Sequence, residues 1–547
     1  MIKKNKRVEK CFKKSIFLII DGMRYDTIKD DLNSKKLYPT LANLASNGLF
    51  TKVITNAQST QFVLPSIFSL TYPLDYGGYN YGIRYRKQSY VETIKNNCRK
   101  KNIMFSTCNG MGIGTSYDRG FDEVYTTFDF RLLIEQKINR TLLYEINLYR
   151  KNIITKKKLI AIIQKEFGIT LDLLKKYYEN YKKDYWPKKL LKLNKFIYTQ
   201  SLAEKEILIN NPEIIINKMQ KVSGGIYWAT LGKKNYNNLS FLFQRIKVAI
   251  IWRSKKFIAR QYIWPFFLLS HYQVLFGDII EGLCQIITKT KKEELHLHIH
   301  LMDLHDCRSI NRFWHLIGRY KYFTKWFLER IKGNTQHKFV YASALMYIDE
   351  YLDKLIKHLK KEKIFDETLM FISADHGSHY AESPRKNNIY QGERFYYEHI
   401  TTPLIISQKL QKKIKSNLCD SMDMTASFLD AIQVPLHKSF KGKSIFNSKK
   451  KFIISENAGS GNADIIRRNL YFTIINEDYK MMTILIKNKF KILKLFNIKK
   501  DPKELNNLYT DINKKKYSNL TLKLLGYIFS ERKLILIKRG MSKIEVD

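Results

Sequence analysis

Three short segments of this chain place polar residues directly after apolar runs. They hold Asp21 in "IIDGMRYD", His305 in "HLMDLHD", and Asp375 and His376 in "ISADHGSH". Alone, each has an ordinary explanation, because Asp-Gly often forms a turn and a histidine after a strand is often held by hydrogen bonds. Together they offer carboxylate oxygens and imidazole nitrogens, which suit a divalent cation. Such a cation would lower the pKa of a hydroxyl and neutralise an oxyanion, as ester cleavage at phosphorus or sulfur requires.

The stretch "STQFVLPSIF", residues 59–68, could supply that hydroxyl. Ser59 and Thr60 lead into apolar residues, with Pro65 close behind, which is typical of the start of a helix. A Ser or Thr at such a place is by default an N-cap, whose oxygen accepts a backbone N–H. The ten residues alone leave both interpretations open, a nucleophile and a cap.

The segments around these groups predict an α/β sheet with its chemistry at the strand ends. Apolar runs that read as strands alternate with helical segments such as "YPTLANLASNGLF". The expected strands are 15–20, 51–57, 102–110, 295–303, 368–377 and 401–407. His296, His298 and His300 alternate along one of them. We expect these histidines to pack under helices rather than to bind a metal.

Composition narrows the class of protein. The chain has 547 residues, and its 44% hydrophobic and 13% aromatic content excludes a largely disordered protein. The formal charge of +46 favours anionic partners, namely nucleic acid, acidic lipid headgroups or an anionic glycan. Six cysteines without CxxC spacing indicate reduced thiols. We find neither a signal peptide nor a spanning helix, so we expect a cytoplasmic protein, with attachment to the inner membrane surface as an alternative.

The composition of the sequence changes between about residues 128 and 290, where Leu, Ile, Tyr and Lys recur with helical periodicity. We expect a basic helical insertion at 128–290. It would separate two parts of a catalytic core, 1–127 and 291–450, and a C-terminal subdomain would follow at 451–547. The Lys and Tyr residues of the insertion could bind a membrane or nucleic acid, but solvated faces of packed helices are the simpler interpretation.

With these segments in order, the chain resembles the sulfatase branch of the alkaline phosphatase superfamily. The matching segments, in sequence order, are "FLIIDGMRYD", "YPTLANLASNGLFTKVITNA", "LPSIFSLTYP", "RGFDEVY", "HLMDLHD", "SADHG", "TTPLIIS", "DMTASFLDAIQVPLHKSFKGKSIF" and "LKLFNIKKDPKELNNLY". The resemblance covers most of the chain except about 128–290. It implies an alkaline-phosphatase-like α/β fold: a mixed, mostly parallel sheet flanked by helices, a helical insertion and a small C-terminal α+β subdomain.

The resemblance also assigns roles at the strand ends. It implies a metal site of Asp21, Asp375 and His376, with the nucleophile as a further ligand. His305 matches the family histidine that contacts the ester or leaving-group oxygen, as a general acid or an oxyanion stabiliser. Sulfatases often place a second Asp after the first, where this chain has Gly22. We therefore expect one metal with a smaller ligand shell, Zn²⁺ or Mn²⁺ before Ca²⁺.

The nucleophile region departs from true sulfatases. Their Cys-x-Pro-x-Arg motif, whose Cys becomes formylglycine, corresponds here to Val63 and Ile67, so formylglycine chemistry is ruled out at this site. The stretch looks more like the phosphoethanolamine transferases, whose nucleophilic Thr lies five residues before the proline. That position is Thr60, which implies a phospho-threonine intermediate. Arg394 and His399 are the best candidates for binding the charged group of the substrate, although surface loop residues are the simpler interpretation.

The sequence thus predicts a metal-dependent hydrolase or transferase that acts on a phosphate ester, or less readily a sulfate ester, through Thr60. Its substrate would be an anionic glycan, a lipid-linked sugar or a phospholipid headgroup. Two alternatives stay open. The first is an inactive sulfatase-fold protein that binds an anionic polymer. The second, suggested only by the charge, is a nucleic-acid-binding protein, which would bind with a steep salt dependence.

Overall fold

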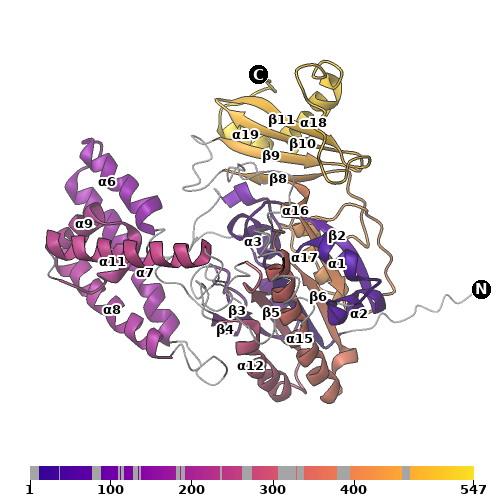
Figure 1. Ribbon diagram of the computed structural model, residues 1–547, viewed down its shortest axis with the longest axis horizontal. Helices are drawn as coiled ribbons and strands as arrows, with labels where there is room; N and C mark the ends of the chain where they lie inside the picture. Colours follow the sequence, from indigo (N-terminus) through magenta and orange to yellow (C-terminus); the bar gives the residue numbers. More distant parts are fainter. Residues whose placement is uncertain are drawn as a thin grey trace, which may run out of the picture.

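The computed structural model describes residues 12–546 except 36, 77–87, 109–110, 112–115, 127–133, 135–136, 180–184, 186–190, 235–236, 261–273, 306–327, 329–337, 379–394 and 459–468. Its centre is a seven-stranded sheet with the strand order β2-β7-β6-β1-β5-β3-β4 (Figure 1). The strands are β1 (Lys14–Ile20), β2 (Leu49–Ile54), β3 (Lys101–Ser106), β4 (Glu123–Thr126), β5 (Leu295–Leu301), β6 (Thr368–Ser373) and β7 (Thr401–Ile406). β7 runs antiparallel to both β6 and β2, and the other neighbouring pairs are parallel. The prediction of a mixed, mostly parallel sheet is confirmed.

Helices cover both faces of this sheet, which explains why its central strands are continuous apolar runs. Every residue of β1, β5 and β6 is buried. On one face, Ile16 and Leu18 of β1 belong to the core formed with α2 (Pro39–Asn47), α12 (Phe276–Lys289) and α15 (Lys338–Lys361). On the other face, Phe17 and Ile19 belong to the core formed with α3 (Thr60–Ser69), α4 (Tyr90–Asn97) and α17 (Ser421–Ala431). Shorter elements of the core are α1 (Tyr25–Asp31), η1 (Pro73–Tyr76), η5 (Phe365–Glu367) and α16 (Tyr397–Ile400).

The histidines of β5 lie on the α3 face of the sheet and are fully buried. The Tyr90 hydroxyl of α4 lies 3.3 Å from Nε2 of His296 and 2.8 Å from Nδ1 of His298. The ring of His298 also packs edge-on against Phe68 of α3. These contacts confirm the interpretation of His296 and His298 as residues packed under helices.

A separate group of helices projects to one side of the sheet (Figure 1). It comprises η2 (Ile138–Leu142), α6 (Leu143–Arg150), α7 (Lys156–Glu179), α8 (Leu191–Asn210), α9 (Pro212–Lys221), α10 (Gly224–Ala229) and α11 (Asn238–Arg260). These helices share a hydrophobic core of their own, built largely from Leu and Ile residues. None of the helices described in the structure is long and apolar enough to cross a membrane.

The C-terminal region forms a four-stranded antiparallel sheet at one end of the central sheet (Figure 1). Its order is β11-β10-β9-β8, and two helices follow it. The elements are β8 (Ile453–Asn457), β9 (Leu470–Ile475), β10 (Tyr479–Ile486), β11 (Lys489–Asn497), α18 (Ser518–Glu531) and α19 (Lys533–Lys538). The side chain of Arg532, between the two helices, reaches Glu456 of β8 and Asp75 of η1. This sheet is thereby tied to the segment that follows α3.

Candidate metal and ester-cleavage site

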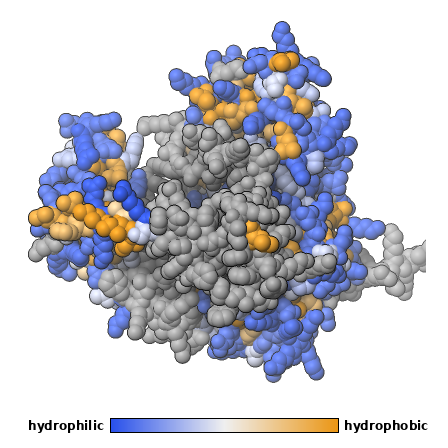
Figure 2. Space-filling view, in the orientation of Figure 1, coloured by the Kyte–Doolittle hydropathy of each residue, from blue (hydrophilic) through white to orange (hydrophobic). Residues whose placement is uncertain are grey.

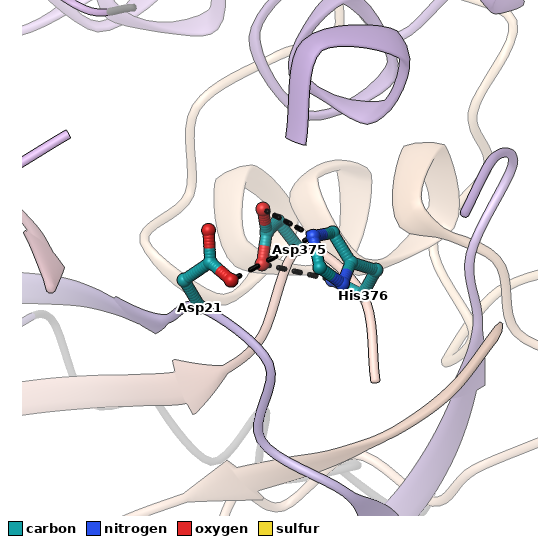
Figure 3. Close-up of side chains that lie close together, drawn as sticks. All are labelled: Asp21, Asp375 and His376. Atoms are coloured by element: carbon teal, nitrogen blue, oxygen red, sulfur yellow. Dashed lines mark hydrogen bonds and ion pairs between the residues drawn. The ribbon is translucent and has the colours of Figure 1, made fainter. Parts of the chain in front are cut away.

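The ends of two neighbouring strands bring the acidic residues together. β1 and β6 pair in parallel, so their carboxyl ends lie at the same edge of the sheet. Asp21 directly follows β1, and Asp375 and His376 follow β6 within three residues. One ligand atom from each of these three residues lies within 4.8 Å of the other two (Figure 3). We call Asp21, Asp375 and His376 the acidic cluster.

Two carboxylate oxygens of the acidic cluster are buried without a hydrogen-bond partner in the described part of the chain. They are Oδ1 of Asp21 and Oδ2 of Asp375, and both side chains are fully buried. These oxygens lie 3.6 and 3.7 Å from Nε2 of His376. Because a buried, unpaired carboxylate is costly, such a pair calls for a cation between them. The donor set therefore fits a divalent metal.

The orientation of His376 fits the same role. Its Nδ1 lies 2.6 Å from the carbonyl oxygen of Gly377, which can only accept, so Nδ1 carries the hydrogen. The lone pair of Nε2 then faces Asp21 and Asp375 (Figure 3). A metal-binding histidine commonly donates its second ring N–H to a backbone carbonyl in this way. The backbone N–H of His376 in turn bonds Oδ1 of Asp375 at 2.9 Å, which fixes that carboxylate.

Thr60 is the first residue of α3, and its hydroxyl points into the acidic cluster. Oγ1 donates to Oδ2 of Asp21 at 2.8 Å and lies 3.2 Å from Nε2 of His376. The N-cap residue of the helix is Ser59, whose side chain makes no capping hydrogen bond. The Thr60 hydroxyl therefore does not cap the helix. It lies at the positive end of the helix dipole, where negative charge is stabilised.

Comparison with solved structures supports the fold. A 2-O GAG sulfatase is 12% identical with a TM-score of 0.53, and the match covers 98% of this chain and 95% of that one. A sulfatase of glycosaminoglycan metabolism in Bacteroides thetaiotaomicron is 13% identical, with a TM-score of 0.54 and coverages of 97% and 99%. A candidate sulfatase from Bacteroides fragilis is 13% identical, with a TM-score of 0.53 and coverages of 98%. No curated protein sequence matches the chain.

The sulfatase family model matches residues 227–434, which include β5, β6 and the Asp375–His376 pair. The chain therefore contains a region that matches the sulfatase family, and it shares the fold of solved sulfatases. The expected resemblance is confirmed at that level. The likeness of the nucleophile region to phosphoethanolamine transferases stays a prediction, because it rests on the spacing between Thr60 and Pro65.

Val63 is the residue that the spacing to Pro65 predicts at the position of the formylglycine precursor. Its side chain is fully buried and belongs to the hydrophobic core between α3 and the sheet. A valine offers no nucleophilic atom. Thr60, one helical turn earlier, presents the hydroxyl nearest to the carboxylates.

Gly22 is the residue expected where many sulfatases carry a second aspartate. Its φ of +77° favours glycine, and a Cβ added there would overlap Oγ of Ser378. That hydroxyl donates to the carbonyl oxygen of Gly22 at 2.8 Å. Tyr341 donates to the same carbonyl at 3.2 Å and accepts the N–H of Arg24 at 2.9 Å. These contacts fix the loop after Asp21. Sequence reasoning missed Ser378 and Tyr341, because nothing local to either residue signals a partner more than 300 residues away.

His305 is the exposed residue at the end of an otherwise buried turn after β5. The buried imidazole of His300 on β5 interacts electrostatically with His305 and with two members of the acidic cluster. Burial lowers its pKa to about 4, and the charges of Asp375, His376 and His305 act on it as well. Both ring nitrogens of His300 lack a hydrogen-bond partner among the described residues. The alternation of histidines along the strand does not predict which of them lies near the acidic cluster.

Of the two residues expected to bind the charged group of the substrate, the structure describes only His399. Arg394 lies outside the described residues. His399 is buried at the end of α16, and its carbonyl oxygen accepts the N–H of Gly377 at 2.7 Å. Its backbone therefore packs against the residue that follows His376. A Cβ at Gly377 would collide with the neighbouring carbonyl of Glu398, so glycine is required there.

Proposed function

We propose that this protein is a metal-dependent ester hydrolase or transferase that uses Thr60 as its nucleophile and acts on a phosphate ester in preference to a sulfate ester. The observation that carries the proposal is the position of the Thr60 hydroxyl. It lies within hydrogen-bond distance of two members of the acidic cluster, Asp21 and His376, at the start of α3. No other described residue of the helix presents a hydroxyl to these ligands.

Asp21, Asp375 and His376 would hold the metal, with the Thr60 oxygen beside them. A divalent cation bound there would lower the pKa of the Thr60 hydroxyl, and its positive charge would neutralise the oxyanion. The acidic cluster offers two carboxylates and an imidazole, which favours Zn²⁺ or Mn²⁺ and leaves Ca²⁺ as an alternative.

The protein residues perform the remaining steps. The Thr60 hydrogen moves toward Oδ2 of Asp21, which already accepts it, while the Thr60 oxygen forms a bond to phosphorus. The bond from phosphorus to the leaving-group oxygen breaks, and that oxygen takes a proton from His305. Water then attacks phosphorus and gives a proton to His305, while the bond from phosphorus to the Thr60 oxygen breaks. That oxygen takes its hydrogen back from Asp21, and phosphate leaves, which completes hydrolysis. A sugar or lipid hydroxyl in place of water would make the same site a transferase.

The substrate is an anionic ester, and a surface glycan or lipid-linked sugar is the class that fits best. The formal charge of +46 attracts such a polyanion. One fold relative is a 2-O GAG sulfatase, and another is a sulfatase of glycosaminoglycan metabolism. Phosphorus is favoured over sulfur because Val63 removes the position of formylglycine. Arg394 and His399 are proposed to bind the charged group of the substrate.

The test compares wild type with Thr60→Ala, Thr60→Ser and Ser59→Ala on aryl phosphate monoester, phosphate diester and sulfate ester substrates. We expect Thr60→Ala to lose roughly a thousandfold or more in kcat, because the nucleophile is gone. Thr60→Ser keeps a hydroxyl and retains activity, and Ser59→Ala matches wild type. Acid-quenched wild type should carry phosphate on Thr60, detected by mass spectrometry. Full activity of Thr60→Ala would reject the mechanism.

Metal analysis separates this enzyme from an inactive protein that only binds an anionic polymer. We expect purified protein, loaded with Zn²⁺ or Mn²⁺ and then desalted, to retain about one ion per chain at the acidic cluster. An inactive protein that only binds an anionic polymer should retain no metal ion at the acidic cluster. If metal is retained but none of the three ester classes is cleaved, the binding-protein alternative is the better description.

A further inference from the structure

Helix α11 carries an apolar stripe that no described part of the chain covers. The stripe consists of Leu239, Leu242, Phe243, Ile246 and Ile250. Their spacing of three, four, seven and eleven residues from Leu239 places all five on one face of the helix. Between 47% and 67% of the surface of each side chain is exposed, and Phe243 is the most exposed.

Near its N-terminal end, the side of α11 opposite the stripe faces the core of its helical group. Phe241 is buried there among residues of α7, α8 and α9. The helix is therefore held in place from one side, while the apolar stripe points away from the core. Figure 2 shows this stripe as an orange area on the projecting helical group, set among blue hydrophilic surface.

Charge distinguishes this helix from an ordinary protein–protein surface. α11 contains six Arg and Lys residues and no Asp or Glu. Arg245 and Lys247 are exposed and flank the apolar stripe on its two sides. Arg253, also exposed, extends the cationic surface toward the C-terminal end. The long aliphatic stems of such side chains can lie along apolar surface while their charges remain in a polar layer.

From this arrangement we propose that α11 docks on the surface of an acidic phospholipid bilayer, with its apolar stripe in the acyl boundary and its Arg and Lys side chains at the phosphate layer. A bilayer of this kind offers both complements at once, apolar chains and anionic headgroups. A soluble anionic glycan or a nucleic acid would satisfy the charges but leave the Leu, Ile and Phe side chains in water. The helix is about 34 Å long, and the stripe runs along its axis, so the helix would lie flat on the bilayer surface.

The experiment uses the full-length protein and sedimentation with vesicles of phosphatidylcholine alone or mixed with phosphatidylglycerol. Wild type should bind the mixed vesicles and not the neutral ones, and added salt should weaken that binding. Phe243→Ser with Ile246→Ser should weaken binding about tenfold, because apolar contact is lost. Arg245→Glu with Lys247→Glu should weaken it by more than about twentyfold, since each cation contributes about fivefold.

Matched controls change exposed residues elsewhere, the apolar ones more exposed than those of the stripe. Ile512→Ser with Leu534→Ser removes apolar side chains that are 92% and 78% exposed, and Lys451→Glu with Lys523→Glu makes the same change of charge. Both controls should bind like wild type, and all variants should keep the wild-type melting temperature. Equal binding to neutral vesicles, or unweakened binding by either α11 variant, would overturn the proposal. So would self-association of wild type without lipid that the Phe243 and Ile246 changes abolish, since the stripe would then be covered by a second copy.

Discussion

Thr60 donates its hydroxyl hydrogen to Asp21 at 2.8 Å, although 39 residues separate the two in the sequence. Asp21 directly follows β1, and Thr60 begins α3, whose fully buried side chains such as Val63 share a hydrophobic core with that strand. The distance between hydroxyl and carboxylate is therefore set by the packing of a helix on a sheet and not by a loop. A site built on packed elements of this kind can hold a nucleophile in one position.

Asp375→Asn should abolish metal binding without destabilising the metal-free protein. The substitution keeps Oδ1 as the acceptor for the N–H of His376, while an amide replaces the unpartnered Oδ2. It removes one of two buried carboxylates that approach the same imidazole, and so relieves an uncompensated charge. Metal content should fall from about one ion per chain to none, and the added metal should no longer raise the free energy of unfolding. For wild type that increase is about 2.7 kcal/mol at a hundredfold excess over Kd.

Asp349→Asn is the matched control, because its carboxylate is also buried but lies away from the acidic cluster. It accepts the N–H groups of Thr40 and Leu41 at the start of α2. This variant should lower the free energy of unfolding by about 1–3 kcal/mol and leave metal content unchanged. Asp375→Asn should thus lose metal but keep its stability, whereas Asp349→Asn should lose stability but keep its metal. If Asp375→Asn retained the ion, the acidic cluster would not be the metal site.

Gly22→Ala should weaken metal binding through the loop that carries Asp21. Its φ of +77° costs an alanine about 1–2 kcal/mol, and the new Cβ would overlap Oγ of Ser378. Combining Gly22→Ala with Ser378→Gly removes the overlap, so the double variant should regain part of the metal affinity. The destabilisation caused by the positive φ of the alanine should remain. Isothermal titration with Zn²⁺ or Mn²⁺ and thermal unfolding separate these two contributions. An affinity of Gly22→Ala equal to wild type would contradict the close packing of this loop.

The sequence sufficed to predict the sheet and the residues at its strand ends. Runs such as residues 15–20 and 368–373 are apolar throughout, because both faces of the central strands are covered, and a polar tip marks where each run leaves the core. The ends of parallel strands share one edge of a sheet. Asp21, Asp375 and His376 could therefore be grouped before any coordinates were known.

What the sequence could not predict depends on contacts between distant segments. Ser378 occupies the space beside Gly22 from 356 residues away, and Tyr90 joins His296 and His298 across more than 200 residues. The alternation of histidines identified one face of β5 but not the tyrosine that lies against it. Likewise, the exposure of the apolar stripe on α11 depends on which of its faces the helical group covers, and periodicity alone does not decide that.

Acidification should destabilise the protein below about pH 6.5, because β5 buries histidines in their neutral form. Burial and then the charge of Lys100 lower the pKa of His296 to about 3, and burial lowers the pKa of His298 well below its ordinary value. Between these values and the unfolded value of about 6.5, the unfolded chain binds protons that the native state does not. The free energy of unfolding should therefore fall with decreasing pH, by about 1.4 kcal/mol per pH unit for each such histidine.

Urea unfolding over a series of pH values measures this slope. His296→Gln should reduce it by about one proton, because the glutamine does not titrate. The control is Ile299→Val on the same buried strand, a change that adds and removes no titratable group. It should lower the free energy of unfolding at every pH and leave the slope as in wild type. An unchanged slope in His296→Gln would mean that the buried ring does not remain neutral.

Arg532→Met should be among the most destabilising single changes at the junction of the C-terminal sheet. The guanidinium is 2% exposed and donates to both carboxylate oxygens of Glu456, at 2.7 and 3.1 Å, and to Asp75 at 2.9 Å. It also lies over the ring of Tyr72, 4.4 Å from its centre. Methionine fills much of the space but leaves Glu456 buried without its cation, which typically costs about 3–5 kcal/mol.

Denaturant unfolding measures this loss, and two further variants identify its cause. Lys533→Met, at the exposed neighbouring residue, should change stability by less than about 0.5 kcal/mol. Adding Glu456→Gln to Arg532→Met neutralises the abandoned carboxylate, so the double variant should be more stable than Arg532→Met alone. If the double variant were less stable by the full sum of the single changes, packing of the Arg532 stem on Tyr72, and not the buried charge, would hold the C-terminal sheet to the segment after α3.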